Sequence, residues 1–187
     1  MGPRMEFFQY DETNIMRRVI NWIVQIAVVI ALAWFCVYAF GTTVKNAGQS
    51  MQPVLENGET ALYDRAAFHL RDPERYDVIV FKSADGAEHI KRIIGMPGET
   101  VQIKNGTVEI NGKNLETDNR NALNTVSIPG LAETPVELGS DEYFVLGDNR
   151  DSSEDSRFES IGNVKKSSIE GKVWIRVSPL IRLSLIH

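Results

Sequence analysis

The stretch Ile90–Ile110, which reads IKRIIGMPGETVQIKNGTVEI, decides the fold class of this chain. It opens on an apolar run of the β type that ends at Gly95-Met96-Pro97-Gly98, a strong turn signal. Two alternating segments, Thr100–Ile103 and Thr107–Ile110, then flank Lys104-Asn105-Gly106. Because Asn-Gly between alternating segments is typical of a two-stranded hairpin, the stretch predicts a strand, a turn and a hairpin.

Three further runs outside this stretch predict strands: Val78–Phe81, Tyr143–Leu146 and a final one at Gly171–Val177. Helical periodicity is weak after the N-terminal segment, although Ala61–Leu70 and Lys165–Glu170 are expected to hold short turns. The polar region 115–140 contains Pro129, Gly130 and Pro135, which predicts long loops with at most short strands. The chain is therefore expected to be mainly β.

The N-terminal part holds a long apolar run, with no charged residue from Val19 to Val44. A helix of this length can cross a hydrocarbon core of about 30 Å. Arg17 and Arg18 precede the run and only Lys45 follows closely, which favours an N-terminus in the cytoplasm and the rest of the chain outside. A cleaved signal peptide and a buried core helix are the other interpretations. The length favours a retained single span, so the lipid bilayer is an expected partner.

Composition and charge exclude several other classes of function. The net charge is −5 and the Lys and Arg residues are scattered, which argues against nucleic-acid binding. None of His69, His89 and His187 has another ligand at zinc spacing, so no metal site is expected. Cys36 is the single cysteine and cannot form an intrachain disulfide.

Ser50 and Lys91 are the candidates for chemistry. Ser50 lies in Gly48-Gln49-Ser50-Met51-Gln52-Pro53, just after the apolar run, and on its own this segment is more typical of a turn than of a nucleophile. A serine nucleophile needs a base, and a lysine can serve if burial lowers its pKa. Lys91 lies among Ile90, Ile93 and Ile94, although an exposed lysine at a strand edge is the common alternative.

Four ordered motifs after the apolar run together resemble the sequence boxes of bacterial type I signal peptidases. They are Ser50-Met51-x-Pro53, Tyr76-Asp77-Val78-Ile79-Val80-Phe81, Lys91-Arg92-Ile93-Ile94-Gly95-Met96-Pro97-Gly98-Glu99 and Gly147-Asp148-Asn149-Arg150-x-x-Ser153-x-Asp155-Ser156-Arg157. The resemblance implies a signal-peptidase or LexA-like serine–lysine protease β fold. It also implies a serine endopeptidase that needs no cofactor and whose partners are secretory preproteins.

The resemblance further implies a role for the matching residues. Ser50 matches the nucleophile, Lys91 the general base, and Ser153 a second serine whose hydroxyl orients the lysine amine. Asp155 and Arg157 match a structural ion pair beside the site.

The other matching residues shape the site and its substrate pocket. Asp148, Asn149 and Arg150 match a turn at one corner of the site, and Met51 and Ile90 are expected beside the nucleophile and the substrate. Gly48 departs from Gram-negative relatives, which carry a serine there whose hydroxyl helps to hold the oxyanion. A small residue at this position and a single span are more similar to Gram-positive relatives. The main-chain N–H of Ser50 would remain an oxyanion donor, and the second donor is left open.

The predicted organisation has three parts: a cytoplasmic N-terminus at 1–18, a transmembrane anchor at 19–42, and an extracytoplasmic catalytic β domain at 43–187 with a small inserted β/loop subdomain at about 102–141. Three alternatives stay open. One is a dedicated pilin-processing relative, and another is an inactive membrane-anchored binding domain. The third is a relative of the endoplasmic-reticulum type with a histidine base, for which His89 is the candidate.

Overall fold

A computed structural model of the chain describes residues 12–115 and 125–186. The chain divides into two compact units, Met1–Tyr38 and Ala39–His187. The first unit holds most of the helix α1 (Glu12–Phe40), in which Ile15–Tyr38 is long and apolar enough to cross a membrane, with a mean hydropathy of 2.2. The helix starts before the predicted span of 19–42 and ends at Phe40, since the chain extends again from Thr42.

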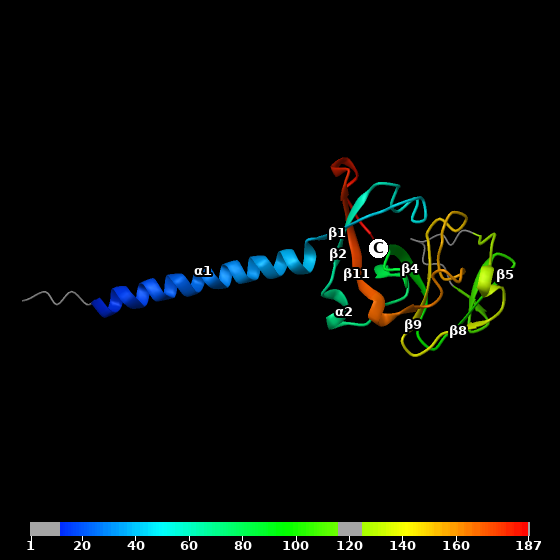
Figure 1. Cartoon of the computed structure of the whole chain (residues 1–187), viewed down its shortest axis with the longest axis horizontal. Coiled ribbons are helices and arrows are strands. Elements are labelled where there is room, and N and C mark those ends of the chain that lie inside the picture. Colours follow the sequence, from blue (N-terminus) through cyan, green and yellow to red (C-terminus); the bar gives the residue numbers. More distant parts are fainter. Residues whose placement is uncertain (1–11, 116–124, 187) are drawn as a thin grey trace, which may run out of the picture. The chain divides into compact units, whose positions relative to one another are not determined.

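The second unit is built around an eight-stranded sheet whose strand pairs are all antiparallel (Figure 1). The spatial order is β1-β2-β11-β3-β4-β9-β10, and β12 pairs with β11. The strands are β1 (Thr42–Lys45), β2 (Thr60–Asp64), β3 (Val78–Lys82), β4 (Glu88–Gly95), β9 (Glu142–Leu146), β10 (Val164–Lys165), β11 (Ile169–Ser178) and β12 (Ser184–Leu185). The long strand β11 thus separates β2 from β3 and joins the first two strands to the rest of the sheet.

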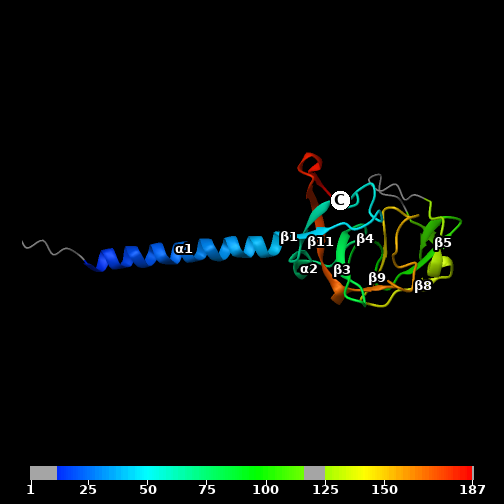
Figure 2. The same cartoon turned by 45° about the horizontal axis from the view of Figure 1, so that its top comes forward.

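A smaller four-stranded sheet follows β4 in the chain and has the order β7-β6-β5-β8 (Figure 2). Its strands are β5 (Thr100–Lys104), β6 (Thr107–Ile110), β7 (Lys113–Asn114) and β8 (Val136–Glu137). Asn105 and Gly106 at the β5–β6 turn both have positive φ, 50° and 78°, as a tight type I′ hairpin requires. The hairpin predicted from Asn-Gly is therefore present, with Lys104 paired to Thr107 across the two-residue turn.

The two sheets share one apolar core. Ile94 of β4 and Phe144 of β9 belong to the same buried cluster as Val101 of β5. The contact is so close that a Cβ on Gly95 would lie 2.5 Å from Val101 Cγ2 and 2.8 Å from Leu138 Cδ1. Glycine is therefore the residue that fits where β4 ends and the chain crosses to the small sheet.

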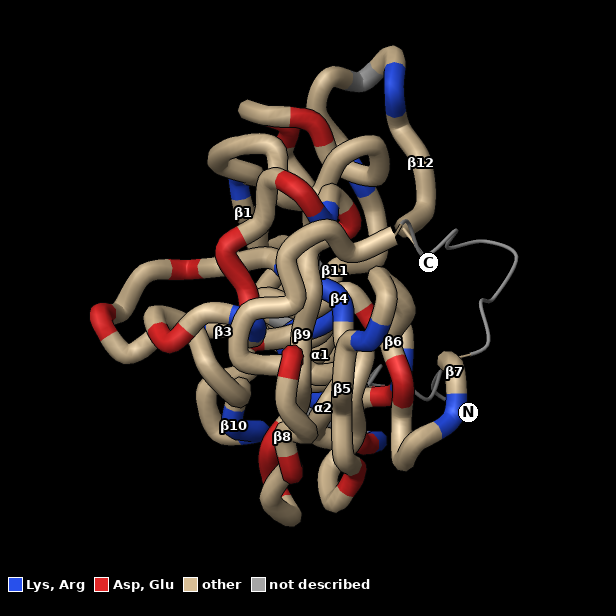
Figure 3. The backbone as a smooth tube through the Cα atoms, turned by 90° about the vertical axis from the view of Figure 1, so that its right-hand side faces the viewer, with Lys and Arg blue, Asp and Glu red and all other residues tan. Residues whose placement is uncertain are grey.

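Short helices complete the second unit: α2 (Ala67–Leu70), η1 (Gly130–Glu133), η2 (Lys166–Ser168) and η3 (Leu180–Arg182). Figure 3 shows acidic and basic residues interspersed over the strands and loops of this unit. Several of them pair across the fold, such as Arg75 with Glu99 and Lys172 with Asp77.

The prediction of a mainly β chain with an N-terminal apolar helix is confirmed. Two local expectations differ from the structure. Ala61–Leu70 was expected to hold a short turn, which α2 forms at Ala67–Leu70, but its first part also belongs to β2, whose residues are alternately half-buried and buried. Gly171–Val177 is not the final strand, because a turn through η3 returns β12 onto β11. Of the predicted loop region 115–140, residues 116–124 lie outside the described residues, as does His187.

Candidate active site

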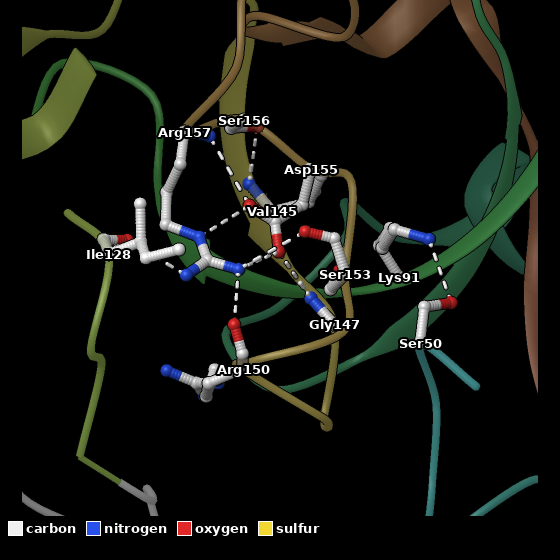
Figure 4. Close-up of polar contacts among 10 residues, drawn as sticks. All are labelled: Ser50, Lys91, Ile128, Val145, Gly147, Arg150, Ser153, Asp155, Ser156 and Arg157. Carbon is white, nitrogen blue, oxygen red and sulfur yellow. Dashed lines mark hydrogen bonds and ion pairs between the residues drawn. The ribbon is translucent and has the colours of Figure 1, made fainter. Parts of the chain in front are cut away.

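Ser50 and Lys91 come from distant parts of the sequence and meet at one point of the large sheet. Ser50 lies in the loop that joins β1 to β2, and Lys91 lies on β4. Lys91 Nζ donates a hydrogen bond of 3.1 Å to Ser50 Oγ and one of 3.2 Å to the carbonyl of Ile90 (Figure 4). A nucleophile and a nitrogen base are therefore within hydrogen-bond reach, as covalent catalysis requires.

The surroundings of Lys91 favour its neutral form. Its side chain is only 4% exposed, and it lies opposite the fully buried Ile79 of β3 in the strand register. Burial lowers the pKa of the Lys91 ammonium, and the negative charges of Asp155, Glu154 and Asp148 oppose this shift. Low polarity therefore outweighs the nearby carboxylates, and the amine can accept a proton at a lower pH than an exposed lysine.

His89 lies two residues before Lys91 and has other partners. One nitrogen of its ring is 3.0 Å from Ser83 Oγ, and the ring stacks on Phe81. Burial and the neighbouring Lys91 charge lower the pKa of His89. Lys91, and not His89, therefore makes the hydrogen bond with Ser50 Oγ.

Asp155 and Arg157 form a buried ion pair beside this point. Arg157 Nε and Nη2 donate to the two oxygens of Asp155 at 2.8 Å and 3.0 Å, and both side chains are at most 1% exposed. Asp155 also accepts from the main-chain N–H of Gly147 at 3.0 Å. Arg157 donates further to the carbonyls of Ile128 and Arg150. The pair therefore fastens the loop that follows β9 to itself and to the neighbouring loop (Figure 4).

Ser153 lies in the same loop, against Gly147. A Cβ on Gly147 would lie 2.2 Å from Ser153 Oγ and 2.5 Å from the carbonyl oxygen of Ser50, so the loop after β9 and the Ser50 segment meet at this glycine. Ser153 Oγ is buried and has no hydrogen-bond partner among the described residues, Lys91 included. The orienting contact with the Lys91 amine stays a prediction.

The turn Asp148-Asn149-Arg150 connects this loop to both halves of the candidate pair. The main-chain N–H of Asn149 donates to the carbonyl of Ser50 at 3.0 Å. Asp148 accepts two hydrogen bonds, of 2.7 Å and 2.8 Å, from the buried guanidinium of Arg92, the residue after Lys91. Arg150 is buried, and the loss of hydration lowers its pKa to about 10. The turn thus holds the Ser50 main chain on one side and β4 on the other.

The residues expected near the substrate differ in their exposure. Met51 and Ile90 belong to one apolar cluster and are almost completely buried. Gly48 is exposed at a φ of +94°, with nothing within 4 Å of where a Cβ would be. Its main-chain N–H donates to Asn57 Oδ1 at 2.9 Å, so this N–H already has an acceptor.

Three residues that hold the site together were not predicted from the sequence: Asn46, Arg92 and Gly147. Arg92 and Gly147 occur in the motifs, but their partners are distant in sequence. Asn46 follows β1 without any motif, and its side chain donates to the carbonyls of Leu55 and Glu56. The sequence signal for this role of Asn46 is an asparagine between a strand and a turn that contains glycine. This pattern is too common in proteins to identify the residue.

Comparisons with known proteins agree with the motifs. Residues 19–178 match the family described as "Signal peptidase, peptidase S26". A probable signal peptidase I-2 of Synechocystis is 35% identical over 145 residues, which are 73% of this chain and 63% of that protein. Signal peptidase IB of Staphylococcus aureus is 28% identical over 176 residues, 87% of this chain and 91% of that protein.

A crystal structure of a signal peptidase I from Enterococcus faecalis is 38% identical, with a TM-score of 0.42, and covers 54% of this chain and 95% of that one. The chain spans less than two thirds of the cyanobacterial relative and nearly all of the staphylococcal one. The matched residues 19–178 include most of the apolar helix, the loop with Ser50, the strand with Lys91 and the loop from Gly147 to Arg157. The predicted resemblance is thereby confirmed: the chain belongs to the signal peptidase family.

Proposed function

We propose that this chain cleaves N-terminal signal peptides from exported preproteins, with Ser50 as nucleophile and Lys91 as general base. The observation that carries the proposal is the 3.1 Å contact between Lys91 Nζ and Ser50 Oγ, made by a lysine that is 4% exposed. An exposed lysine holds its proton at neutral pH and cannot activate a hydroxyl. A desolvated one can, because the charged form loses its hydration.

In the acylation half-reaction, neutral Lys91 takes the proton of Ser50 while Oγ attacks the scissile carbonyl carbon. The main-chain N–H of Ser50 donates to the resulting oxyanion. When the carbon–nitrogen bond breaks, the lysine ammonium gives its proton to the leaving amine. This releases the mature protein and leaves the signal peptide esterified to Ser50.

In the deacylation half-reaction, Lys91 takes a proton from a water molecule, whose oxygen attacks the ester carbonyl. The carbon–Oγ bond breaks, and the proton returns from Lys91 to Ser50. Every proton moves through one amine, so the chemistry of this cycle is carried by protein groups and water.

The substrate is proposed to bind as an added strand. Within the described residues, β4 pairs with β3 along Glu88–Arg92 and with β9 only from Arg92 onward. The opposite edge of Glu88–Lys91 therefore carries no strand, and it leads directly to the Lys91 amine. An extended peptide paired there presents alternate side chains to the site, which suits recognition of small residues at two positions before the cut.

The helix α1 is proposed to anchor the enzyme in the cell membrane by a single span, with the N-terminus in the cytoplasm. The apolar segment Ile15–Tyr38 supports this, and so do the positive charges of Arg17 and Arg18 near its N-terminal end. Ser50 follows the end of the helix by ten residues in sequence. The nucleophile is thus tethered where the end of a membrane-inserted signal peptide emerges.

The test is cleavage of a purified preprotein in detergent by the full chain and its variants. Ser50→Ala and Lys91→Met are each expected to abolish processing, while the folded state is checked by circular dichroism. A Lys91→Met variant that retains processing close to the unmodified enzyme would rule out the lysine as base.

A further inference from the structure

The segment that carries Ser50 is a long loop fastened from several sides. The Ser50 loop, residues 46–59, leaves the sheet after β1 and re-enters it at β2, where Lys45 pairs with Thr60. Inside the loop, Asn46 donates through its side chain to the carbonyls of Leu55 and Glu56, at 2.9 Å and 3.0 Å. These bonds give the loop its shape, but they do not fix it to the rest of the fold.

A second set of contacts comes from the C-terminal arm, residues 176–186, which comprises the end of β11, η3 and β12. Arg176 is the central residue of this set. Its Nη1 donates to the carbonyl of Val54 at 3.0 Å and to Glu59 Oε2 at 3.3 Å. Its Nε donates to the carbonyl of Arg182 at 2.7 Å. One guanidinium therefore joins the Ser50 loop to the arm and the arm to itself.

Within the Ser50 loop, Glu59 is the residue that binds the two arginines of the arm. It is 5% exposed, and its Oε2 also accepts from the main-chain N–H of Glu56 at 2.8 Å. Arg182 Nη1 makes ion pairs with Glu59 at 3.0 Å and with Glu56 at 2.6 Å. A carboxylate buried to this extent needs its cations, because an unpaired charge in this setting loses its hydration without compensation.

The apolar side of the same junction is continuous with the floor of the candidate site. Ile186 of the arm packs in one buried cluster with Met51 and Leu55 of the loop and with Ile90 of β4. Met51 follows Ser50 directly, and Ile90 precedes Lys91. A shift of the arm would therefore be passed to both neighbours of the dyad through packed side chains, since a close-packed core does not deform freely.

We propose that Arg176 and Glu59 are positioning residues for the nucleophile: their contact holds the Ser50 loop against the C-terminal arm so that Ser50 Oγ stays within reach of Lys91 Nζ. The inference rests on the proposed serine–lysine function, and it assigns a catalytic contribution to a part of the chain that lies outside the four motifs. Neither residue contacts the dyad, so both act through the loop.

The experiment compares Arg176→Met and Glu59→Gln with the matched variant Arg71→Met in the full chain in detergent. Arg71 likewise donates to a main-chain carbonyl, that of Asp72, and to a buried carboxylate, Asp77. Like Glu59, Asp77 keeps a second cation after the change, here Lys172. Arg71 belongs to the connection between α2 and β3, away from the Ser50 loop.

We expect Arg176→Met and Glu59→Gln to lower kcat for preprotein cleavage by about 10- to 100-fold, because a displacement of about 1 Å costs this much in a positioned reaction. The KM should stay within about twofold, since neither side chain borders the substrate edge of β4. Arg71→Met should lower the thermal midpoint to a similar extent and leave kcat unchanged. Arg176→Lys, which keeps the charge beside Glu59, should recover part of the loss.

Two further measurements separate positioning from general destabilisation. The double variant Arg176→Met/Glu59→Gln should lose less kcat than the product of the two single losses, because both changes remove the shared contact between Arg176 and Glu59. A crystal structure of Arg176→Met should show Ser50 Oγ farther from Lys91 Nζ. Unchanged kcat in both single variants, or equal losses in Arg71→Met, would overturn the assignment.

The outcome is distinguishable from failure of the proposed function. If Ser50→Ala and Lys91→Met abolish cleavage while Arg176→Met and Glu59→Gln cleave normally, only the positioning role fails. If Ser50→Ala cleaves normally, the proposed dyad itself is wrong, and the changes at Arg176 then report on a different site.

Discussion

At the scale of single residues, the proposed mechanism depends on the electrostatic balance at Lys91. Burial lowers the pKa of its ammonium, and three carboxylates, Asp155, Glu154 and Asp148, oppose that effect. Asp155 and Asp148 are each bound to an arginine, whereas Glu154 is exposed. Glu154 is therefore the carboxylate whose charge can be removed without breaking a buried ion pair.

This balance predicts a shift in pH dependence for Glu154→Gln. Under the proposed mechanism catalysis needs neutral Lys91, so kcat/KM is expected to rise as pH increases through the pKa of this amine. Removing the Glu154 charge takes away a stabilising influence on the ammonium and lowers the pKa further. The rise of kcat/KM with pH should therefore begin at lower pH in this variant.

The measurement is kcat/KM for preprotein cleavage across neutral and alkaline pH. Glu159→Gln is the control, because Glu159 lies in the same loop but is not among the groups that shift the pKa of Lys91. A rise that moves to higher pH, or moves equally in the control, would contradict this account of the balance.

Gly147 leads to a second prediction at this scale. An added Cβ would meet Ser153 Oγ at 2.2 Å and the Ser50 carbonyl at 2.5 Å, so Gly147→Ala must push the Ser50 segment or the Ser153 loop away. We expect kcat to fall by about 100-fold, with a loss of stability of about 1–3 kcal/mol. Cleavage kinetics and thermal unfolding of the purified variant check this, and near-normal kcat would show that the convergence on Gly147 is dispensable.

Single residues also mark the limit of prediction from sequence. Ser50 and Lys91 stand in motifs, and an apolar neighbourhood predicts the burial of Lys91. The bonds of Arg92 to Asp148 and of Arg176 to Val54 span 56 and 122 residues. Such pairings depend on which strands become neighbours, and a charged residue in a strand gives no sign of its distant partner.

At the scale of elements, predictions succeeded where the signal is local. The turn Asn105-Gly106 specifies its hairpin because both residues tolerate positive φ. β1 was missed because its residues extend the uncharged run of the helix. β2 was not predicted because its alternation is short and its strand partners, β1 and β11, are not recognisable from its own residues.

The two turns of the small sheet, β5–β6 with Gly106 and β6–β7 with Gly112, provide a matched stability test. Gly106 and Gly112 have nearly equal positive φ, 78° and 75°, but a Cβ at Gly106 would lie 2.3 Å from Thr125 Cγ2, whereas nothing lies within 4 Å at Gly112. Alanine at either position carries a backbone cost of about 1 kcal/mol. Gly106→Ala carries the contact in addition and should therefore lower the free energy of unfolding more than Gly112→Ala in denaturant titrations. Equal losses in the free energy of unfolding would show that Thr125 can move away from the added methyl group without destabilising the fold.

At the scale of the whole molecule, the apolar helix predicts how the protein partitions between membrane and water. Ile15–Tyr38 is fully exposed as a helix in water, so the hydrophobic effect favours its insertion into lipid. Full-length protein should stay in the pellet when membranes are washed with alkaline carbonate. A variant lacking residues 1–40 should appear in the supernatant, and its retention in the pellet would point to a further membrane contact in the β unit.

The position of β11 in the large sheet has a consequence for biosynthesis. This strand lies between β2 and β3, so the part of the sheet that carries Ser50 and the part that carries Lys91 have no shared hydrogen-bond ladder until residues 169–178 are in place. A nascent chain that has emerged only as far as β10 already contains both side chains but lacks the strand that sets them side by side. The proposed peptidase activity is therefore expected to arise only after β11 has been synthesised.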